Sequence, residues 1–237
     1  MPIYKIKLLN RTEVANNTWV FHFEKPVGFT FKPGQYGGFT LIHAKSVDPA
    51  HITRRFSFLS APFDENLSIA TRIQLSAYKQ ALMSLQIGDE IKLAGPTGAF
   101  TLHENINIPA VFIAGGIGIT PFYSMIRDAI HQRVMQPMYL FYGNQTIEDA
   151  AFFHELTALS KSNPQFKFIP VFDRANEEWQ GERGYITDTI LKKYLDDIIL
   201  PNYYVCGSPA MVTALQELLM EMGIESDKIK VEDFPGY

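Results

Sequence analysis

The stretch 111–125, VFIAGGIGITPFYSM, limits the possible folds of this chain more than any other segment. It opens with four apolar residues, a β-branched and aromatic run typical of a strand buried on both faces of a parallel sheet. Gly115, Gly116 and Gly118 then let the backbone turn sharply, and Thr120 with Pro121 has the residue types of a helix N-cap and first helical position. A strand, a glycine turn and a helix N-terminus together form an anion site that suits a pyrophosphate.

The turn alone leaves two interpretations open. In the dinucleotide-binding fingerprint a third glycine follows the second by three residues. Here Gly118 is followed by Ile119, Thr120 and Pro121 instead. A glycine-rich strand-to-helix turn that binds no ligand is therefore the alternative, and the rest of the chain has to decide between the two.

Strands and helices alternate from residue 111 onward. The strand-like segments VFIAG, MYLFYG, FKFIPVF, YYVCG and KIKVEDF are separated by segments of helix length, which predicts a parallel sheet with right-handed crossovers. Ligands of such sheets bind at the carboxyl ends of the strands. Small or polar residues occur at four of these ends: the glycine turn, Tyr142-Gly143-Asn144, Asp173-Arg174 and Cys206-Gly207-Ser208. We therefore expect a doubly wound parallel α/β nucleotide-binding domain over residues 105–237.

Residues 1–104 have a different pattern. YKIKLL, TWVFHFEK and YGGFTLIH are of strand length, and prolines and glycines separate them, so this part predicts a small antiparallel barrel. The segment SAYKQALMSL interrupts the strands as a helix. Ser76 is its expected N-cap, and the expected apolar face consists of Ala77, Ala81, Leu82 and Leu85.

Composition excludes several classes of protein. The net charge is −4 and the basic residues are scattered, so no footprint for nucleic acid is present. No stretch approaches the roughly 20 apolar residues of a membrane span or has the form of a signal peptide. The single cysteine, Cys206, excludes an internal disulfide, a cysteine-ligated iron–sulfur cluster and a zinc ribbon, and the six histidines lack metal-ligand spacing. We expect a soluble cytoplasmic protein without a metal site.

The segment RRFSFLS, residues 54–60, combines three chemistries on one extended run. Arg54 can bind a phosphate, Phe56 can pack against a flat heterocycle, and the Ser57 hydroxyl can reach a ring nitrogen. This combination indicates a flavin site. The alternative is a solvated strand edge, because arginines are mostly exposed in any fold.

Five motifs, RRFSFLS, AGPTGAF, GGIGITP, YVCGSPAMV and VEDFPGY, occur in this order over almost the whole chain. In this combination the sequence resembles the ferredoxin–NADP reductase-like family of FAD/NAD(P)-binding oxidoreductases. The resemblance implies an N-terminal antiparallel six-stranded β-barrel that binds FAD and a C-terminal domain that binds NAD(P)H. The flavin and nicotinamide rings then meet between the domains.

The resemblance also assigns roles in FAD binding. Arg54 matches the arginine on the flavin pyrophosphate, Phe56 matches an aromatic residue, more often tyrosine, that stacks on the isoalloxazine, and Ser57 matches the serine near flavin N5. Four more residues fall where the family contacts the cofactor: Thr71, Arg72, Ser76 and Lys79. This chain has SAYK where relatives have a glycine-rich turn, and Ser76 can equally be a helix cap only.

In the second half, Gly115, Gly116, Gly118 and Thr120 match the turn on the nicotinamide dinucleotide pyrophosphate. Cys206, followed by Gly207, matches the cysteine beside nicotinamide C4 and flavin N5, although a buried cysteine is often packing alone. Glu232 matches the glutamate that connects this centre to solvent protons, so Ser57, Cys206 and Glu232 form the predicted catalytic set. Phe234 matches the aromatic residue over the second flavin face, unless Tyr237 takes that place.

The sequence says least about the nucleotide and the electron acceptor. Asn144 offers no charge to a 2′-phosphate, and Arg174 is either a phosphate ligand or a surface residue paired with Asp173, so NADH is only slightly favoured over NADPH. The leading hypothesis is an NAD(P)H-dependent FAD reductase that serves a separate acceptor such as a ferredoxin, a flavodoxin or an oxygenase component. The alternatives are a reductase of free flavin, quinone or ferric iron, and a non-catalytic FAD- and nucleotide-binding regulatory module. The oligomeric state is left open.

Overall fold

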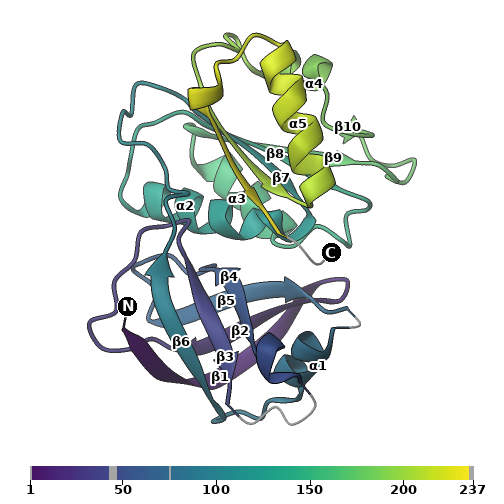
Figure 1. Ribbon diagram of the computed structural model, residues 1–237. Coiled ribbons are helices and arrows are strands. Elements are labelled where there is room, and N and C mark those ends of the chain that lie inside the picture. Colours follow the sequence, from purple (N-terminus) through teal and green to yellow (C-terminus); the bar gives the residue numbers. More distant parts are fainter. Residues whose placement is uncertain (1, 43–46, 75, 235–237) are drawn as a thin grey trace.

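The chain forms two domains that lie one above the other in Figure 1. A computed structural model describes residues 2–42, 47–74 and 76–234. The first domain contains an antiparallel sheet of six strands in the order β4-β3-β6-β1-β2-β5. Its strands are β1 (Ile3–Ala15), β2 (Thr18–Glu24), β3 (Tyr36–Leu41), β4 (Thr53–Ser57), β5 (Asn66–Arg72) and β6 (Glu90–Thr97).

Alternating burial explains why these segments form strands around one core. In β3 every second residue is buried, which places Phe39 and Leu41 inside. Phe21, Phe23 and Phe58 join them in the same buried cluster. The predicted six-stranded antiparallel domain is therefore confirmed.

Helix α1 (Ala77–Ser84) lies within this domain and differs from the prediction in detail. Ser76 occupies the N-cap position, but its hydroxyl makes no capping hydrogen bond. Ala77 is exposed, and the buried face contains Tyr78 together with Ala81 and Leu82. Tyr78 can be buried because its hydroxyl donates a hydrogen bond of 2.9 Å to the carbonyl oxygen of Phe39.

The second domain contains a parallel sheet in the order β10-β9-β8-β7-β11-β12. Its strands are β7 (Ala110–Gly115), β8 (Met138–Asn144), β9 (Phe166–Phe172), β10 (Glu182–Arg183), β11 (Asn202–Gly207) and β12 (Ile229–Asp233). The helices are α2 (Ile119–His131), α3 (Phe153–Ser162), α4 (Asp188–Tyr194) and α5 (Pro209–Glu221). The predicted boundary between residues 104 and 105 falls in the segment that joins β6 to β7.

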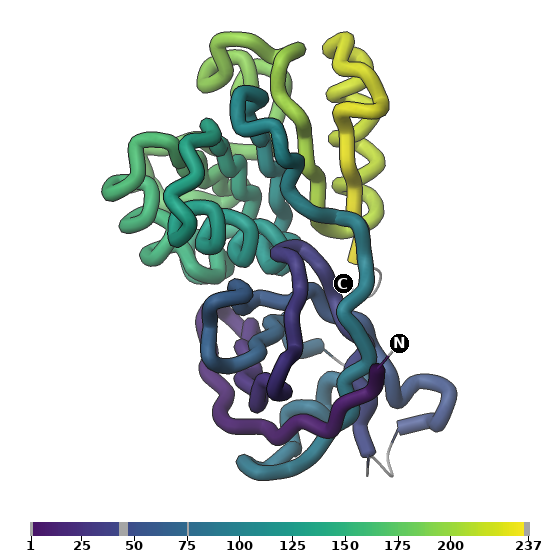
Figure 2. Tube along the Cα trace, turned by 90° about the vertical axis from the view of Figure 1, so that its left-hand side faces the viewer, coloured from purple at the N-terminus to yellow at the C-terminus, as the bar shows by residue number. Residues whose placement is uncertain are grey.

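Helices cover both faces of the parallel sheet. Figure 2 shows α2 and α3 on one side of it and α5 on the other. Phe112 packs in the cluster of α2 and α3, while Val111 and Ile113 pack in the cluster of α4 and α5. Because β7 is buried on both faces, it is apolar throughout, as the sequence predicts. The doubly wound fold is confirmed.

The chain order reverses between β7 and β11, and this reversal places the ligand-binding edge. From β7 the chain adds β8, β9 and β10 on one side, and then returns to add β11 and β12 on the other. In such sheets ligands bind outside the carboxyl ends of the strands at this switch point. The glycine turn after β7 and the residues Cys206 and Gly207 at the end of β11 therefore lie at the expected binding edge.

The predicted start of α2 is wrong. A 3₁₀ turn, η2 (Gly116–Gly118), leads directly into α2, which begins at Ile119 with Gly118 in the N-cap position. Thr120 is already helical, and its buried hydroxyl donates to the carbonyl oxygen of Ile117 at 3.1 Å. Thr120 therefore stabilises the turn from inside and does not cap the helix. Two further 3₁₀ turns are η1 (Pro49–His51) and η3 (Ser226–Lys228).

A shared apolar cluster holds the domains together. It combines Val20, Leu59 and Ala70 of the first domain with residues of α2 and the parallel sheet, such as Phe122 and Met125. Among the helices in the described residues, none is long and apolar enough to cross a membrane.

Candidate functional site

The three predicted catalytic residues come together where the two domains meet. Ser57 is the last residue of β4 and is buried. Glu232 on β12 pairs in register with Cys206 on β11. The Ser57 hydroxyl donates to Oε2 of Glu232 at 3.5 Å, the outer limit of a hydrogen bond. Ser57 of the first domain thus contacts Glu232 of the second, and Glu232 lies beside Cys206 on the neighbouring strand.

Burial controls the protonation of this group. It raises the pKa of Glu232 to about 7, with a further increase from Asp233 and an opposing effect from the Ser57 hydrogen bond. Burial also raises the pKa of the Cys206 thiol, and the carboxylates of Glu232 and Asp233 add to the increase. Glu232 can therefore hold or release a proton near neutral pH, whereas Cys206 stays a neutral thiol.

The glycine turn has one packed side and one open side. A Cβ on Gly118 would lie 2.6 Å from the carbonyl carbon of Cys206 and 2.8 Å from the nitrogen of Gly207, so only glycine fits. Gly115 is likewise packed against the side chain of Met211. Gly116 has φ +52° and no atom within 4 Å of a Cβ position. The turn is thus pressed against β11 at Gly118, while Gly116 leaves space in which a phosphate group could approach the backbone.

The first domain has a cluster of positive charge at the predicted flavin pyrophosphate site. Burial lowers the pKa of Lys79, and the nearby guanidinium groups of Arg72 and Arg54 lower it further. Arg54 lies over the ring of Tyr78, 5.7 Å from its centroid. Within the described part of the chain, neither Arg54 nor Lys79 has a carboxylate at ion-pair distance. A bound pyrophosphate would relieve this repulsion, so the residues fit such a group.

The other predicted flavin contacts lie around this cluster. Phe56 is half-buried and packs edge-on against Phe39, with ring centroids 5.8 Å apart. Thr71 is buried, and its hydroxyl lies 3.4 Å from the carbonyl oxygen of Arg72. The hydroxyl of Ser76 does not cap α1, so the interpretation of Ser76 as a cap only does not fit its side chain.

Phe234, one of the two candidates for covering the flavin, lies beside the predicted catalytic residues. The backbone nitrogen of Phe234 donates to the carbonyl oxygen of Gly207 at 3.0 Å, and its side chain packs against the cluster that includes Cys206. Tyr237, the other candidate for covering the flavin, lies outside the described residues.

Asn144 and Arg174 lie at other strand ends and not in this group. The Asn144 amide is buried beside the Tyr142 hydroxyl, but none of these polar atoms meets the distance and angle of a hydrogen bond with a described residue. Arg174 is 70% exposed, and its Nε lies 3.9 Å from Oδ2 of Asp173. No contact between described residues joins Arg174 to Ser57, Cys206 or Glu232.

Sequence reasoning missed two features of this site. Tyr78 supports Arg54 through its ring, and its place two residues after Ser76 in SAYK was the available signal. Asp233 raises the pKa of both Glu232 and Cys206. Asp233 directly follows Glu232 in the chain, but its proximity to Cys206 follows from the parallel pairing of β12 with β11, which local sequence does not reveal.

An antiparallel domain with a cationic cluster, joined to a parallel-sheet domain with a glycine turn at its switch point, defines a two-domain dinucleotide-binding oxidoreductase. Residues 112–217 match the family described as "Oxidoreductase NAD-binding domain". The chain is 29% identical to NADH-cytochrome b5 reductase 1 of Eremothecium gossypii, over 94% of this chain and 80% of that protein. It is 28% identical to Ferredoxin--NADP reductase B of Sorangium cellulosum, over 90% and 89%. It spans about half the length of several other relatives.

The fold is similar to that of a ferredoxin NADP+ reductase from Neisseria gonorrhoeae with bound FAD and NADP. The TM-score is 0.83 at 24% identity, and 98% of each chain is covered. In its matched NAD-binding domain, its relatives and its fold, this chain is similar to the ferredoxin reductase-like family of FAD- and NAD(P)-binding oxidoreductases. These findings support the predicted family and enzyme class, while the roles assigned to individual residues stay predictions.

Proposed function

We propose that this protein oxidises NAD(P)H, transfers the hydride to FAD held by the first domain, and delivers the electrons to a separate acceptor. The observation that carries this proposal is the contact of Ser57 with Glu232 across the domain boundary, beside Cys206 and the glycine turn. A flavin and a nicotinamide held by different domains can react only where those domains meet.

The two cofactors would use different parts of the site. Arg54, Arg72 and Lys79 would hold the FAD pyrophosphate, and Phe56 would pack against its ring. The turn from Gly115 to Gly118 would hold the pyrophosphate of NAD(P)H, with Gly116 on the open side. When bound, FAD supplies a centre that accepts two electrons and can release them singly or in pairs.

The chain's own residues would orient the reactants and manage one proton. The Ser57 hydroxyl is a hydrogen-bond donor fixed at a strand end. With its pKa raised to about 7, the Glu232 carboxyl group can take up or release a proton near neutral pH, and the Ser57 hydroxyl donates to Oε2 of its carboxylate form. Cys206 is fully buried and neutral, so it fills space and excludes water without adding charge. Hydride transfer then depends mainly on positioning.

We favour NADH over NADPH as the donor. Arg174 is exposed and lies beside Asp173, whose carboxylate would repel a 2′-phosphate but could accept a hydrogen bond from a ribose hydroxyl. Comparison of the reduction rate with each nucleotide, in wild type and in Asp173→Asn, tests this preference. If the aspartate matters, the variant uses NADPH better and NADH worse.

The acceptor is best sought among separate electron carriers. The names of the two relatives given above specify a cytochrome b5 and an NADP+/ferredoxin couple, so their acceptors differ. Turnover of the NADH-reduced protein with a ferredoxin, a flavodoxin and an oxygenase component, measured against free FMN, a quinone and ferric citrate, tests the proposal. Fast turnover with the small molecules alone would favour a reductase of free flavin, quinone or ferric iron. A protein that NADH does not reduce would favour the regulatory module.

A further inference from the structure

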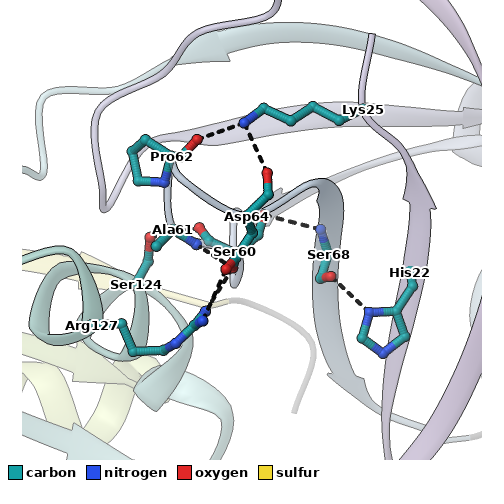
Figure 3. Close-up of polar contacts among 9 residues, drawn as sticks. All are labelled: His22, Lys25, Ser60, Ala61, Pro62, Asp64, Ser68, Ser124 and Arg127. Carbon is teal, nitrogen blue, oxygen red and sulfur yellow. Dashed lines mark hydrogen bonds and ion pairs between the residues drawn. The ribbon is translucent and has the colours of Figure 1, made fainter. Parts of the chain in front are cut away.

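A second set of polar contacts joins the domains between the barrel segment 60–65 and α2 (Figure 3). The Arg127 guanidinium makes two parallel hydrogen bonds to the Asp64 carboxylate, at 2.6 and 2.9 Å. One turn earlier on the helix, the Ser124 hydroxyl donates to the carbonyl oxygen of Ser60 at 2.7 Å. These four residues, Ser60, Asp64, Ser124 and Arg127, are called the interdomain clasp below.

The barrel side of the clasp is held rigidly. Oδ2 of Asp64 also accepts a hydrogen bond from the backbone nitrogen of Ala61 at 2.9 Å. The Lys25 ammonium donates to the carbonyl oxygens of Pro62 and Asp64, at 2.6 and 3.1 Å (Figure 3). The Ser60 hydroxyl accepts from the backbone nitrogen of Ser68 at 3.1 Å. Because the segment that carries Asp64 is fixed within the first domain, it cannot follow Arg127 if the second domain moves, and the ion pair would break.

The ion pair differs from an ordinary surface pair. Only 26% of the Arg127 side chain and 23% of the Asp64 side chain are exposed. The Arg127 guanidinium also lies over the rings of Phe63 and Tyr123, 5.1 and 5.4 Å from their centroids. A bidentate, partly buried pair fixes geometry more strictly than an exposed pair, which contributes little.

The clasp holds the two segments that carry the site. Ser60 follows Ser57 by three residues, and α2 starts immediately after the glycine turn, at Ile119. The Ser57–Glu232 contact itself is 3.5 Å long and too weak to fix the domains. We propose that Arg127 is a positioning residue for hydride transfer, which, through Asp64, keeps the second domain where Ser57 can reach Glu232. This inference rests on the function proposed above.

A cleft of about 490 Å³ lies beside the clasp, between the domains, and leaves space for the domains to move when the ion pair is lost. His22, Ser68, Tyr123 and Glu155 help to line this cleft between the domains. Without the ion pair we expect the cleft to widen, while the shared apolar cluster keeps the two folded domains joined. The expected consequence is therefore a displacement of one domain against the other, and not unfolding.

The test uses the FAD-containing protein and four variants. Arg127→Gln removes the ion pair of the clasp, Arg127→Lys keeps the charge but loses the bidentate geometry, and D64R/R127D exchanges the partners. Lys5→Gln is the control, because it removes an exposed pair with Glu90 that lies within the barrel. All are compared in anaerobic stopped-flow reduction by saturating NADH.

We expect Arg127→Gln to slow flavin reduction at least about tenfold, since small misplacements strongly affect oriented reactions. The affinities for NADH and FAD should change less than about twofold. Arg127→Lys should be intermediate, the exchange variant should recover part of the rate, and Lys5→Gln should match wild type. Reduction of folded Arg127→Gln at the wild-type rate would overturn the proposal.

Hydrogen–deuterium exchange provides a readout that does not depend on activity. In Arg127→Gln, segments 57–64 and 229–234 should exchange faster, while β2 and β8 keep their protection. Unchanged exchange everywhere, or faster exchange in β2 and β8 as well, would overturn a positioning role. If wild type itself were not reduced by NADH, the proposed function would fail, and the exchange result would still show whether Arg127 holds the domains together.

Discussion

Replacement of Gly118 by alanine tests whether contact between the glycine turn and β11 sets the geometry of the site. The backbone of Gly118 is right-handed helical, with φ −60° and ψ −7°, so alanine is conformationally allowed there. On backbone entropy alone, Gly118→Ala should stabilise the protein by about 0.4–1 kcal/mol. The predicted damage therefore comes from packing alone.

The structure gives the size of that damage. The added methyl would lie 2.6 Å from the carbonyl carbon of Cys206, whereas ordinary contacts begin at 3.4 Å. The turn and β11 must therefore separate by at least about 0.8 Å, because both neighbours are backbone atoms. Overpacking of this kind costs about 1–3 kcal/mol of folding free energy. A misplacement near 1 Å can lower the rate of an oriented reaction by up to about 100-fold.

The assay combines thermal unfolding with anaerobic stopped-flow reduction of the flavin. After subtraction of the entropic gain, the net cost is at most about 2.6 kcal/mol, which in a chain of this length lowers Tm by up to about 10 °C. We also expect a reduction rate at least about tenfold lower. Gly28→Ala is the matched control, because Gly28 has φ +75° and open space around a Cβ position. The control should lose about 1–2 kcal/mol but keep the wild-type reduction rate. A Gly118→Ala protein with unchanged or raised Tm and the wild-type rate would refute the reasoning.

Three other substitutions test the remaining roles. Because burial raises the pKa of Glu232 to about 7, the folded state favours the protonated form, so the free energy of unfolding should fall by up to about 3 kcal/mol as the pH rises from 4.5 through 7. Glu232→Gln should flatten that dependence in urea titrations, and a dependence identical to wild type would exclude Glu232 as its source. Lys79→Gln should weaken FAD binding about tenfold, which a fluorescence titration measures. It should not destabilise the FAD-free protein, because it removes the repulsion of Lys79 by Arg72 and Arg54; urea unfolding measures this stability. Cys206→Ala should slow flavin reduction while FAD stays bound, and unchanged kinetics would remove Cys206 from the mechanism.

The architecture was predictable because burial leaves a pattern in the sequence. The period of two in β3 and the continuous apolar run of β7 distinguish a curved antiparallel sheet from a parallel sheet covered on both faces. The start of α2 was not predictable in the same way. Thr120 and Pro121 have the residue types of a helix start, but the 3₁₀ turn Gly116–Gly118 leads directly into α2 at Ile119. Helix-cap preferences do not predict a 3₁₀ turn that continues into an α-helix.

The glycine turn and the segment RRFSFLS stand out by their own residue chemistry, whereas Cys206, Glu232 and Phe234 enter the prediction only through the resemblance to a family. Ser57 and Glu232 are 175 positions apart, and nothing in the local sequence indicates that they meet. Arg127 and Asp64 are 63 positions apart and belong to no motif used in the sequence analysis. Contacts of this kind depend on how the domains pack, which residue spacing does not encode.

The most direct test of the whole account is an anaerobic absorption titration of the purified protein with NADH and, separately, with NADPH. The account predicts a yellow protein whose flavin absorption is bleached by about one equivalent of nucleotide, with NADH the faster donor. A protein that retains FAD but is bleached by neither nucleotide would contradict it.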